Sequence, residues 1–173
     1  MTRLLLVRHG ETDWNAEGRL QGQTDRPLSD YGRRQARQLA DELEGEPFEA
    51  IYSSDLARAR ETAEIVGRRL EMPVELDSDL REKDWGTWEG LNAAERDRVE
   101  FVGESTAAHQ ERILKALRRI SERYSGEGVV LVVTHGGSMR RVQTAAMGMA
   151  LPVVENCGRW LCEVENGTFR AVD

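Results

Sequence analysis

The chain has 173 residues, of which 39% are hydrophobic and 32% charged, and these proportions predict a single globular domain spanning residues 1–173. The formal net charge of −7 argues against a nucleic-acid-binding protein, because phosphate backbones attract basic surfaces. The first apolar run, Leu4 to Val7, is too short for a secretory signal or a membrane span, so we expect a cytoplasmic protein without membrane contact.

Six strands are predicted from short apolar and β-branched runs that are bounded by turn residues. They are Leu4–Arg8, Phe48–Ser53, Val74–Leu76, Val129–Thr134, Trp160–Glu165 and Thr168–Val172. Asn166-Gly167 separates the last two strands and is a strong signal for a two-residue hairpin.

Four helices are predicted between these strands, where apolar residues recur at helical spacing. Their cap and stop residues place them from Ser29 to Gly45, from Ser54 or Asp55 to near Pro73, from Ser105 onward, and after Gly136-Gly137. Alternating strands and helices predict a three-layer α/β/α sandwich with a mainly parallel sheet, and the final hairpin predicts an antiparallel edge.

Basic side chains lie where three of the predicted strands end. Arg8 ends the first strand and His9 follows it, Arg58 lies just after the second, and His135 follows the fourth. The carboxyl ends of parallel strands share one edge of the sheet, so these groups can converge there. Arginine suits a phosphoryl group because its planar fork donates two hydrogen bonds at once.

Each residue also has a simpler interpretation when it is taken alone. A single histidine at a strand end is most often a satisfied polar residue, and Arg58 alone would be a solvated helix charge. Their meeting at one predicted edge favours a phosphate site. His109 has no such support, and its neighbours Gln110 and Glu111 predict an exposed position on a helix.

No metal site or cofactor is expected, because the three histidines stand far apart in the sequence and show no ligand spacing. Cys157 and Cys162 form no CxxC pair, and we expect both to be reduced thiols.

Five strings, in chain order, carry a resemblance to a known family: LLLVRHGETDWN, LQGQTDRPLSDYGRRQA, IYSSDLARARETAE, LREKDWGTWEGL and VVTHGGSMRR. They resemble the phosphoglycerate-mutase-like branch of the histidine phosphatase superfamily. The similarity weakens between about Ala94 and Thr106 and again after Pro152.

The resemblance implies a role for each matching residue. His9 would attack phosphorus and form a phosphohistidine, which splits hydrolysis into two displacements. Glu82 would protonate the leaving oxygen and then deprotonate the attacking water. The positions that match the family's phosphate contacts are Arg8, Asn15, Gln21, Gly22, Arg58, His135 and Gly136. No metal ion is implied, since arginines supply the positive charge.

The choice of phosphoryl acceptor separates phosphatases from mutases in this family. The mutases carry a lysine at the position of Ala93, followed by an insertion that this chain lacks before Gly103. Arg96 and Arg98 could replace part of the positive charge that the mutases have there. A shorter cover admits water, so we expect a phosphatase that acts on a small phosphorylated metabolite.

Several alternatives stay open at this point. They are a cofactor-dependent phosphoglycerate mutase, an α-ribazole phosphate phosphatase, a protein phosphohistidine phosphatase and, least favoured, a non-enzymatic phosphate-binding module. Trp14, Trp85 and Trp88 either line the mouth of the pocket or pack in the core.

Overall fold

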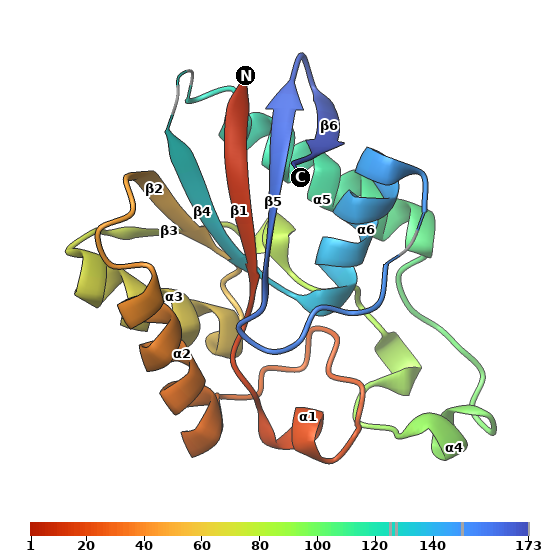
Figure 1. The fold of residues 1–173 in the computed structure, drawn as a ribbon. Coiled ribbons are helices and arrows are strands. Elements are labelled where there is room, and N and C mark those ends of the chain that lie inside the picture. The colour runs from red at the N-terminus through yellow and green to blue at the C-terminus, as the bar shows by residue number, and fades with distance from the viewer. Residues whose placement is uncertain (125, 127, 150, 173) are drawn as a thin grey trace.

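The computed structural model describes residues 1–124, 126, 128–149 and 151–172. One sheet of six strands lies at its centre in the order β3-β2-β4-β1-β5-β6 (Figure 1). The strands are β1 (Thr2–Arg8), β2 (Phe48–Ser53), β3 (Val74–Leu76), β4 (Val129–Thr134), β5 (Arg159–Glu165) and β6 (Thr168–Ala171). The first four are parallel and the last two antiparallel, which confirms the predicted sheet.

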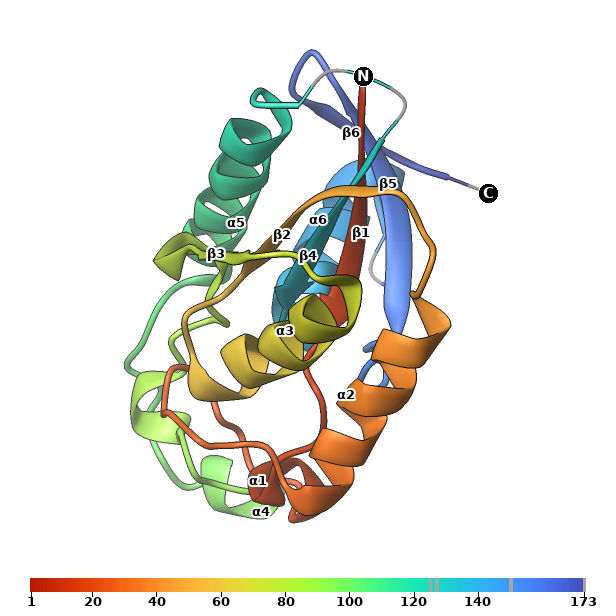
Figure 2. The same ribbon diagram turned by 90° about the vertical axis from the view of Figure 1, so that its left-hand side faces the viewer.

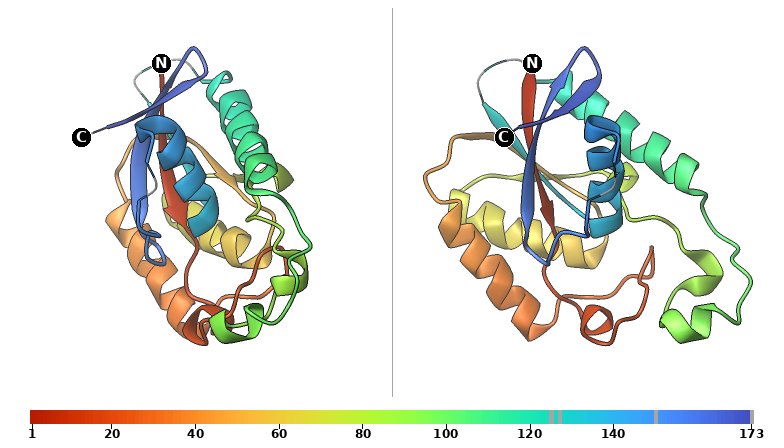
Figure 3. Two further views of the ribbon diagram at one scale, coloured as in Figure 1. Left: turned by 90° about the vertical axis from the view of Figure 1, so that its right-hand side faces the viewer. Right: turned by 45° about the vertical axis from the view of Figure 1, so that its right-hand side comes forward.

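Helices cover both faces of the sheet, so the predicted three-layer sandwich is confirmed. Helices α2 (Asp30–Glu42) and α3 (Ala57–Leu70) lie on one face, and α5 (Thr106–Ser121) and α6 (Gly136–Met147) lie on the other (Figures 2 and 3). The short helices α1 (Asp13–Ala16) and α4 (Ala93–Arg96) lie beyond the carboxyl ends of the parallel strands (Figure 1). Two 3-10 turns, Ser78–Leu80 and Gly86–Trp88, complete the same region.

Two apolar cores hold the layers together. Along β1, Leu4 and Leu6 pack under α5 and α6, whereas Leu5 and Val7 face α2 and α3. This alternation follows from the two-residue period of a strand, and it makes β1 apolar on both faces. Burying one such side chain contributes about 1.5–3 kcal/mol, so the central strands are rigid supports for the residues that follow them.

The start of α3 differs from the prediction. Its N-cap is Leu56, which provides no side-chain cap, rather than Ser54 or Asp55. Asp55 instead accepts two hydrogen bonds from the Arg81 guanidinium, each 2.6 Å long. The Ser54 hydroxyl lies 2.8 Å from Nε2 of His135. Both polar side chains are therefore used in tertiary contacts instead of capping the helix.

The other boundaries differ by a few residues at most. Helix α6 begins at Gly136 itself, α3 ends at Leu70, and β6 ends at Ala171 rather than Val172. The Asn166-Gly167 hairpin is confirmed, with φ of 49° and 76°, as a turn with two left-handed residues requires. Cys157 and Cys162 are free thiols. Among the described helices, none has the length and apolarity needed to cross a bilayer.

Candidate active site

The predicted basic residues meet at one cavity of about 390 Å³ beyond the carboxyl ends of β1 and β4. Its lining residues come from several separate parts of the chain and include both polar and apolar side chains. They are Arg8, His9, Asn15, Arg19, Leu20, Gln21, Gly22, Arg58, Glu82, Trp85, Arg96, Gly136, Gly137, Arg140 and Val153. His135 lies next to this set, with its ring centroid 5.2 Å from that of His9.

His9 is held as a neutral imidazole with one defined tautomer. Its side chain is buried, and Nδ1 lies 2.6 Å from the carbonyl oxygen of Gly10. A carbonyl only accepts, so Nδ1 carries the proton and Nε2 presents its lone pair. Burial, followed by the charges of Arg58 and Arg8, lowers the pKa of His9 well below its usual value of 6.5. The unprotonated nitrogen is the form that can act as a nucleophile.

Arg58 is buried at the start of α3, with 1% of its surface exposed. Its terminal nitrogens donate to the carbonyl oxygens of Gly22 at 2.6 Å and Thr24 at 3.0 Å. Burial lowers its pKa to about 10, so the guanidinium stays charged at neutral pH. Arg8 donates to the carbonyl of Val154 at 2.8 Å, and burial lowers its pKa also. These carbonyl contacts fix the position of both cations without neutralising them.

Several buried nitrogens around the cavity have no hydrogen-bond partner. Among the described residues, five buried side-chain polar atoms are unpaired, and four of these are nitrogens at this site: Nε of Arg8, Arg58 and Arg140, and Nδ1 of His135. An unpaired buried polar group costs roughly 1–3 kcal/mol, so such groups rarely cluster without a reason. Their concentration here fits a cavity built to receive an oxyanion.

His135 is buried directly after β4, where it also serves as the N-cap residue of α6. Burial is the main cause that lowers its pKa well below 6.5, and the Arg58 charge adds to the effect. A Ser54 hydroxyl that donates to Nε2 places the ring proton on Nδ1, the nitrogen without a partner. His135 can then act as a neutral hydrogen-bond donor.

Two amide side chains are oriented by contacts to their oxygen atoms. Asn15 Oδ1 accepts from the backbone of Thr12 at 3.1 Å and from Asn156 Nδ2 at 3.2 Å. Gln21 Oε1 accepts from the Thr12 hydroxyl at 2.7 Å. Both residues line the cavity, so their amide nitrogens are the groups that can donate to an anion.

Close packing explains the predicted glycines at the site. Gly22 has a φ of 56°, and a Cβ there would lie 1.9 Å from Oε1 of Glu89. At Gly136 a Cβ would lie 2.7 Å from the side chain of Val153 and 3.2 Å from Nε of Arg8. Only glycine fits both positions without displacing these neighbouring side chains.

Glu82 also lines the cavity and is held by backbone donors. Oε1 accepts from the N–H of Lys83 and Oε2 from the N–H of Gly137, both at 2.8 Å. The carboxylate therefore lies at the amino end of α6, where the helix dipole favours negative charge. Its position in the cavity lets it exchange a proton with a ligand held by the arginines.

The structure places His109 in the interior, which contradicts the predicted surface position. Its exposure is 2%, and Nε2 lies 2.9 Å from Oγ of Ser138 and 3.6 Å from Oε1 of Glu82. The prediction was wrong because it weighed the polar neighbours in the sequence. Ile113, four residues later, lies on the same side of α5 and in the core, so the helical spacing placed His109 on the buried face.

Sequence reasoning missed two cationic residues at the mouth of the cavity. Arg19 and Arg140 line it, and Arg96, which was considered only as a substitute for a mutase lysine, lines it too. Arg140 lies four positions after Gly136 on α6, and both line the cavity, so the helical register was a usable signal. Arg19 gave no such signal, because it lies in the irregular segment after α1.

The three tryptophans differ in their positions. Trp85 lines the cavity, whereas Trp88 stacks behind it with ring centroids 6.0 Å apart. Trp14 packs against Gly90, outside the set of lining residues. Among the described residues, no three His, Cys, Asp or Glu side chains gather closely enough to hold a metal ion.

Comparison with known proteins identifies the family. The model of the histidine phosphatase superfamily (branch 1) matches residues 4–172. The Bacillus subtilis protein named "Uncharacterized phosphatase PhoE" is 35% identical over 153 residues, which is 86% of this chain and 79% of that protein. The Arabidopsis thaliana metal-independent phosphoserine phosphatase is 37% identical over 162 residues, which is 82% of this chain and 67% of that protein.

Proteins with mutase names and a solved phosphatase structure are also similar. "Probable phosphoglycerate mutase GpmB" of Salmonella arizonae is 34% identical over 166 residues, which is 86% of this chain and 76% of that protein. The structure of mycobacterial glucosyl-3-phosphoglycerate phosphatase in complex with VO3 has a TM-score of 0.89 and 29% identity, covering 99% of this chain and 98% of that one. The chain therefore belongs to the histidine phosphatase superfamily, branch 1, with the fold of its phosphoglycerate-mutase-like phosphatases.

Proposed function

We propose that this protein is a metal-independent phosphatase that hydrolyses phosphomonoesters of small metabolites through a phosphohistidine on His9. One observation carries the proposal: a neutral histidine with a free Nε2 lies among buried cationic nitrogens that lack partners. Such a cavity offers a nucleophile and the donors for a phosphoryl group in one place.

The first half-reaction transfers the phosphoryl group to the protein. Nε2 of His9 attacks phosphorus, so an N–P bond forms while the bond from phosphorus to the leaving oxygen breaks. Arg8, Arg58 and His135 donate to the phosphoryl oxygens. The amides of Asn15 and Gln21 add donors, and Gly22 and Gly136 leave the space that the phosphoryl group needs. Glu82 gives its proton to the leaving oxygen, which departs as an alcohol.

The second half-reaction returns the protein to its starting state. Glu82, now a carboxylate, takes a proton from water, and the water oxygen attacks phosphorus. The N–P bond breaks, phosphate leaves, and His9 is again neutral. The arginines stabilise the charge that develops on phosphorus in both halves, a role that metal ions perform in other phosphoryl-transfer enzymes.

The mouth of the cavity favours a substrate with a second negative charge. Arg19, Arg96 and Arg140 line the cavity in addition to the residues assigned to the phosphoryl group, so we place the leaving group beside them. Two of the similar proteins are named for substrates that carry a carboxylate besides the phosphate, phosphoserine and glucosyl-3-phosphoglycerate. A phosphorylated small acid is therefore the substrate class that we propose.

The proposed activity is tested by phosphate release from para-nitrophenyl phosphate and from a panel of phosphorylated acids, sugars and α-ribazole phosphate. We expect turnover of para-nitrophenyl phosphate and a preference for the acids within the panel. No release from any of these compounds would refute the assignment and favour a phosphate-binding module.

A phosphoglycerate mutase is the second candidate, because Arg96 and Arg140 in the cavity can hold a substrate carboxylate and similar proteins carry that name. The test supplies 3-phosphoglycerate with catalytic 2,3-bisphosphoglycerate. Rapid isomerisation without phosphate release would establish the mutase, whereas phosphate release without isomerisation would exclude it.

A further inference from the structure

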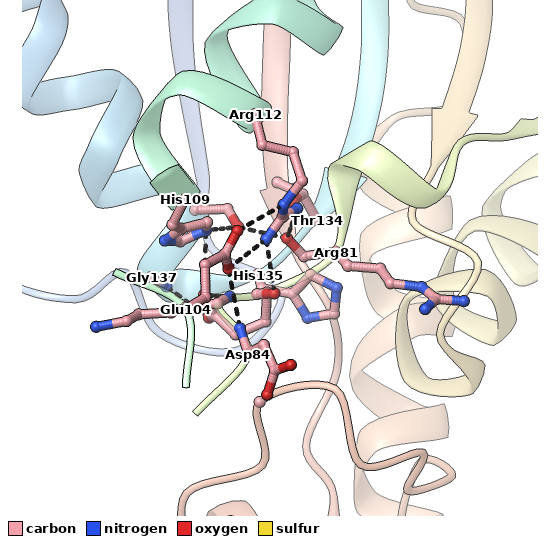
Figure 4. Close-up of polar contacts among 12 residues, drawn as sticks. Arg81, Asp84, Glu104, His109, Arg112, Thr134, His135 and Gly137 are labelled. Atoms are coloured by element: carbon pink, nitrogen blue, oxygen red, sulfur yellow. Dashed lines mark hydrogen bonds and ion pairs between the residues drawn. The ribbon is translucent and has the colours of Figure 1, made fainter. Parts of the chain in front are cut away.

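His109 approaches Glu82 from the interior of the protein. The helix α5 directs His109 and Arg112 toward the loop that contains residues 79–82 (Figure 4). Arg112 donates to the backbone oxygens of Asp79, Arg81 and Glu82 at distances of 2.9 to 3.1 Å. The loop is thus fixed through its backbone, while His109 is near the carboxylate itself.

The hydrogen bonds around Ser138 define the tautomer of His109. The Ser138 hydroxyl donates to the carbonyl of Arg81 at 3.2 Å, so its oxygen is free to accept from His109 Nε2 at 2.9 Å. Nε2 therefore carries a proton, which it donates to Ser138, and Oε1 of Glu82 lies 3.6 Å from the same nitrogen, beyond hydrogen-bond distance. The carboxylate faces an N–H dipole on this side instead of an apolar wall.

The charge state of His109 follows from its surroundings. Burial lowers its pKa from 6.5, and the charges of Arg112 and Arg141 act in the same direction. Glu82 and Glu104 oppose this effect but do not reverse it. The imidazole is therefore neutral at physiological pH.

We propose that His109 is a positioning residue for proton transfer, whose neutral ring, held by Ser138 with Nε2 3.6 Å from Oε1, acts as a nearby dipole that keeps the Glu82 carboxyl turned toward the leaving oxygen. This inference rests on the proposed role of Glu82 as proton donor. A protonated imidazole would form an ion pair with Glu82 and oppose protonation of the carboxyl, whereas a neutral one lets it gain and lose a proton in each cycle. His109 keeps its own proton throughout, so no further proton acceptor is needed.

Two variants of His109 separate the N–H group from simple packing. His109→Leu fills the space without a donor, and His109→Gln retains an N–H group at a similar distance from the backbone. We expect His109→Leu to lower kcat for phosphoserine by about tenfold, a part of the roughly 10²–10⁴-fold effect of general acid catalysis. We expect kcat for para-nitrophenyl phosphate, whose leaving group needs little protonation, to change by less than about twofold, and His109→Gln to restore most of the phosphoserine rate.

Inhibition by inorganic phosphate reports whether the pocket itself is intact, and its inhibition constant should not change in either variant. Leu117→Ala serves as the packing control, because this side chain is buried in the same core on α5 but has no contact with Glu82. It should lower thermal stability without changing the ratio of the two substrate rates. Equal losses on both substrates in His109→Leu, or no rescue by His109→Gln, would overturn the inference.

The variant Glu82→Gln distinguishes this inference from the proposed function. If Glu82→Gln slows phosphoserine hydrolysis selectively and His109→Leu does not, the role of His109 fails while the proton donor stands. If Glu82→Gln is itself unselective, the assigned proton donor fails. In the Glu82→Gln background, His109→Leu should cause no further selective loss, because no transferable proton remains to be positioned.

Discussion

Replacing Gly137 by alanine should stabilise the fold and impair catalysis at the same time. Gly137 is the second residue of α6, and alanine is more favourable than glycine in a helix by up to about 1 kcal/mol. A Cβ at this position would lie 2.4 Å from Oε1 of Glu82 and 2.8 Å from Oε2. The obstructing atoms are the flexible end of a side chain, so the helix can keep its path while the carboxyl moves away.

The size of the catalytic loss follows from this displacement. The carboxyl must retreat by about 1 Å to reach ordinary van der Waals distance, and a misplacement of that size costs on the order of 10²-fold in rate. We therefore expect Gly137→Ala to lower kcat for phosphoserine by about 10²-fold and for para-nitrophenyl phosphate by much less, because its leaving group needs little protonation. The thermal midpoint should stay the same or rise by a few degrees, up to about 4 °C.

The assay combines thermal unfolding with steady-state kinetics on both substrates. Glu82→Ala is the matched background, because the three atoms nearest to a Cβ at position 137 all belong to the Glu82 carboxyl group. In that background Gly137→Ala should stabilise the protein and leave the remaining rate unchanged. Full phosphoserine activity in the single variant, or equal losses on both substrates, would refute the placement of the proton donor beside Gly137.

Four further predictions concern the nucleophile, the metal requirement, the histidines and the mouth of the cavity. His9→Ala should abolish turnover and acid-labile phosphoryl labelling; labelling that persists would exclude His9. A chelator should leave the activity unchanged, and a loss that divalent cations restore would contradict the metal-free mechanism. The free energy of unfolding should fall as the pH drops below about 6.5, because His9, His109 and His135 stay neutral in the native state and take up protons in the unfolded chain. The loss should reach up to about 1.4 kcal/mol per pH unit for each histidine, and urea unfolding at several pH values tests this. Arg140→Gln should raise KM for phosphoserine several-fold more than KM for para-nitrophenyl phosphate, and equal changes would place Arg140 at the phosphate instead of the leaving group.

The sheet and the convergence of the basic residues could be predicted because both follow from local patterns. The apolar runs of β1 and β4 can be read directly, and parallel strands bring their carboxyl ends together. Arg8 ends β1, and His9 and His135 directly follow β1 and β4, so their meeting needed only the topology. The position of Glu82 came from the family resemblance, since it lies in an irregular segment after a short 3-10 turn.

The parts that were missed depend on tertiary contacts. The Ser54 hydroxyl contacts His135, a residue 81 positions away, and no local pattern indicates that partner. For His109 a local pattern did exist, because its helical spacing predicted a buried position. Its polar neighbours in the sequence predicted an exposed one, and we followed the neighbours. Burial prevailed because Glu82 and Ser138 supply polar partners on the inner face of α5.

The cations at this site have two effects that act in sequence. Before substrate binds, burial lowers the pKa of His9 and the charges of Arg58 and Arg8 add to the effect, so the imidazole is already neutral. A bound phosphate dianion would offset those charges and favour protonation of any exposed base. The tautomer of His9 is fixed independently of the arginines, because Nδ1 donates to the Gly10 carbonyl at 2.6 Å. In the proposed mechanism the free Nε2 bonds to phosphorus as the ligand arrives, so the same arginines would first prepare the nucleophile and then stabilise the transferred group.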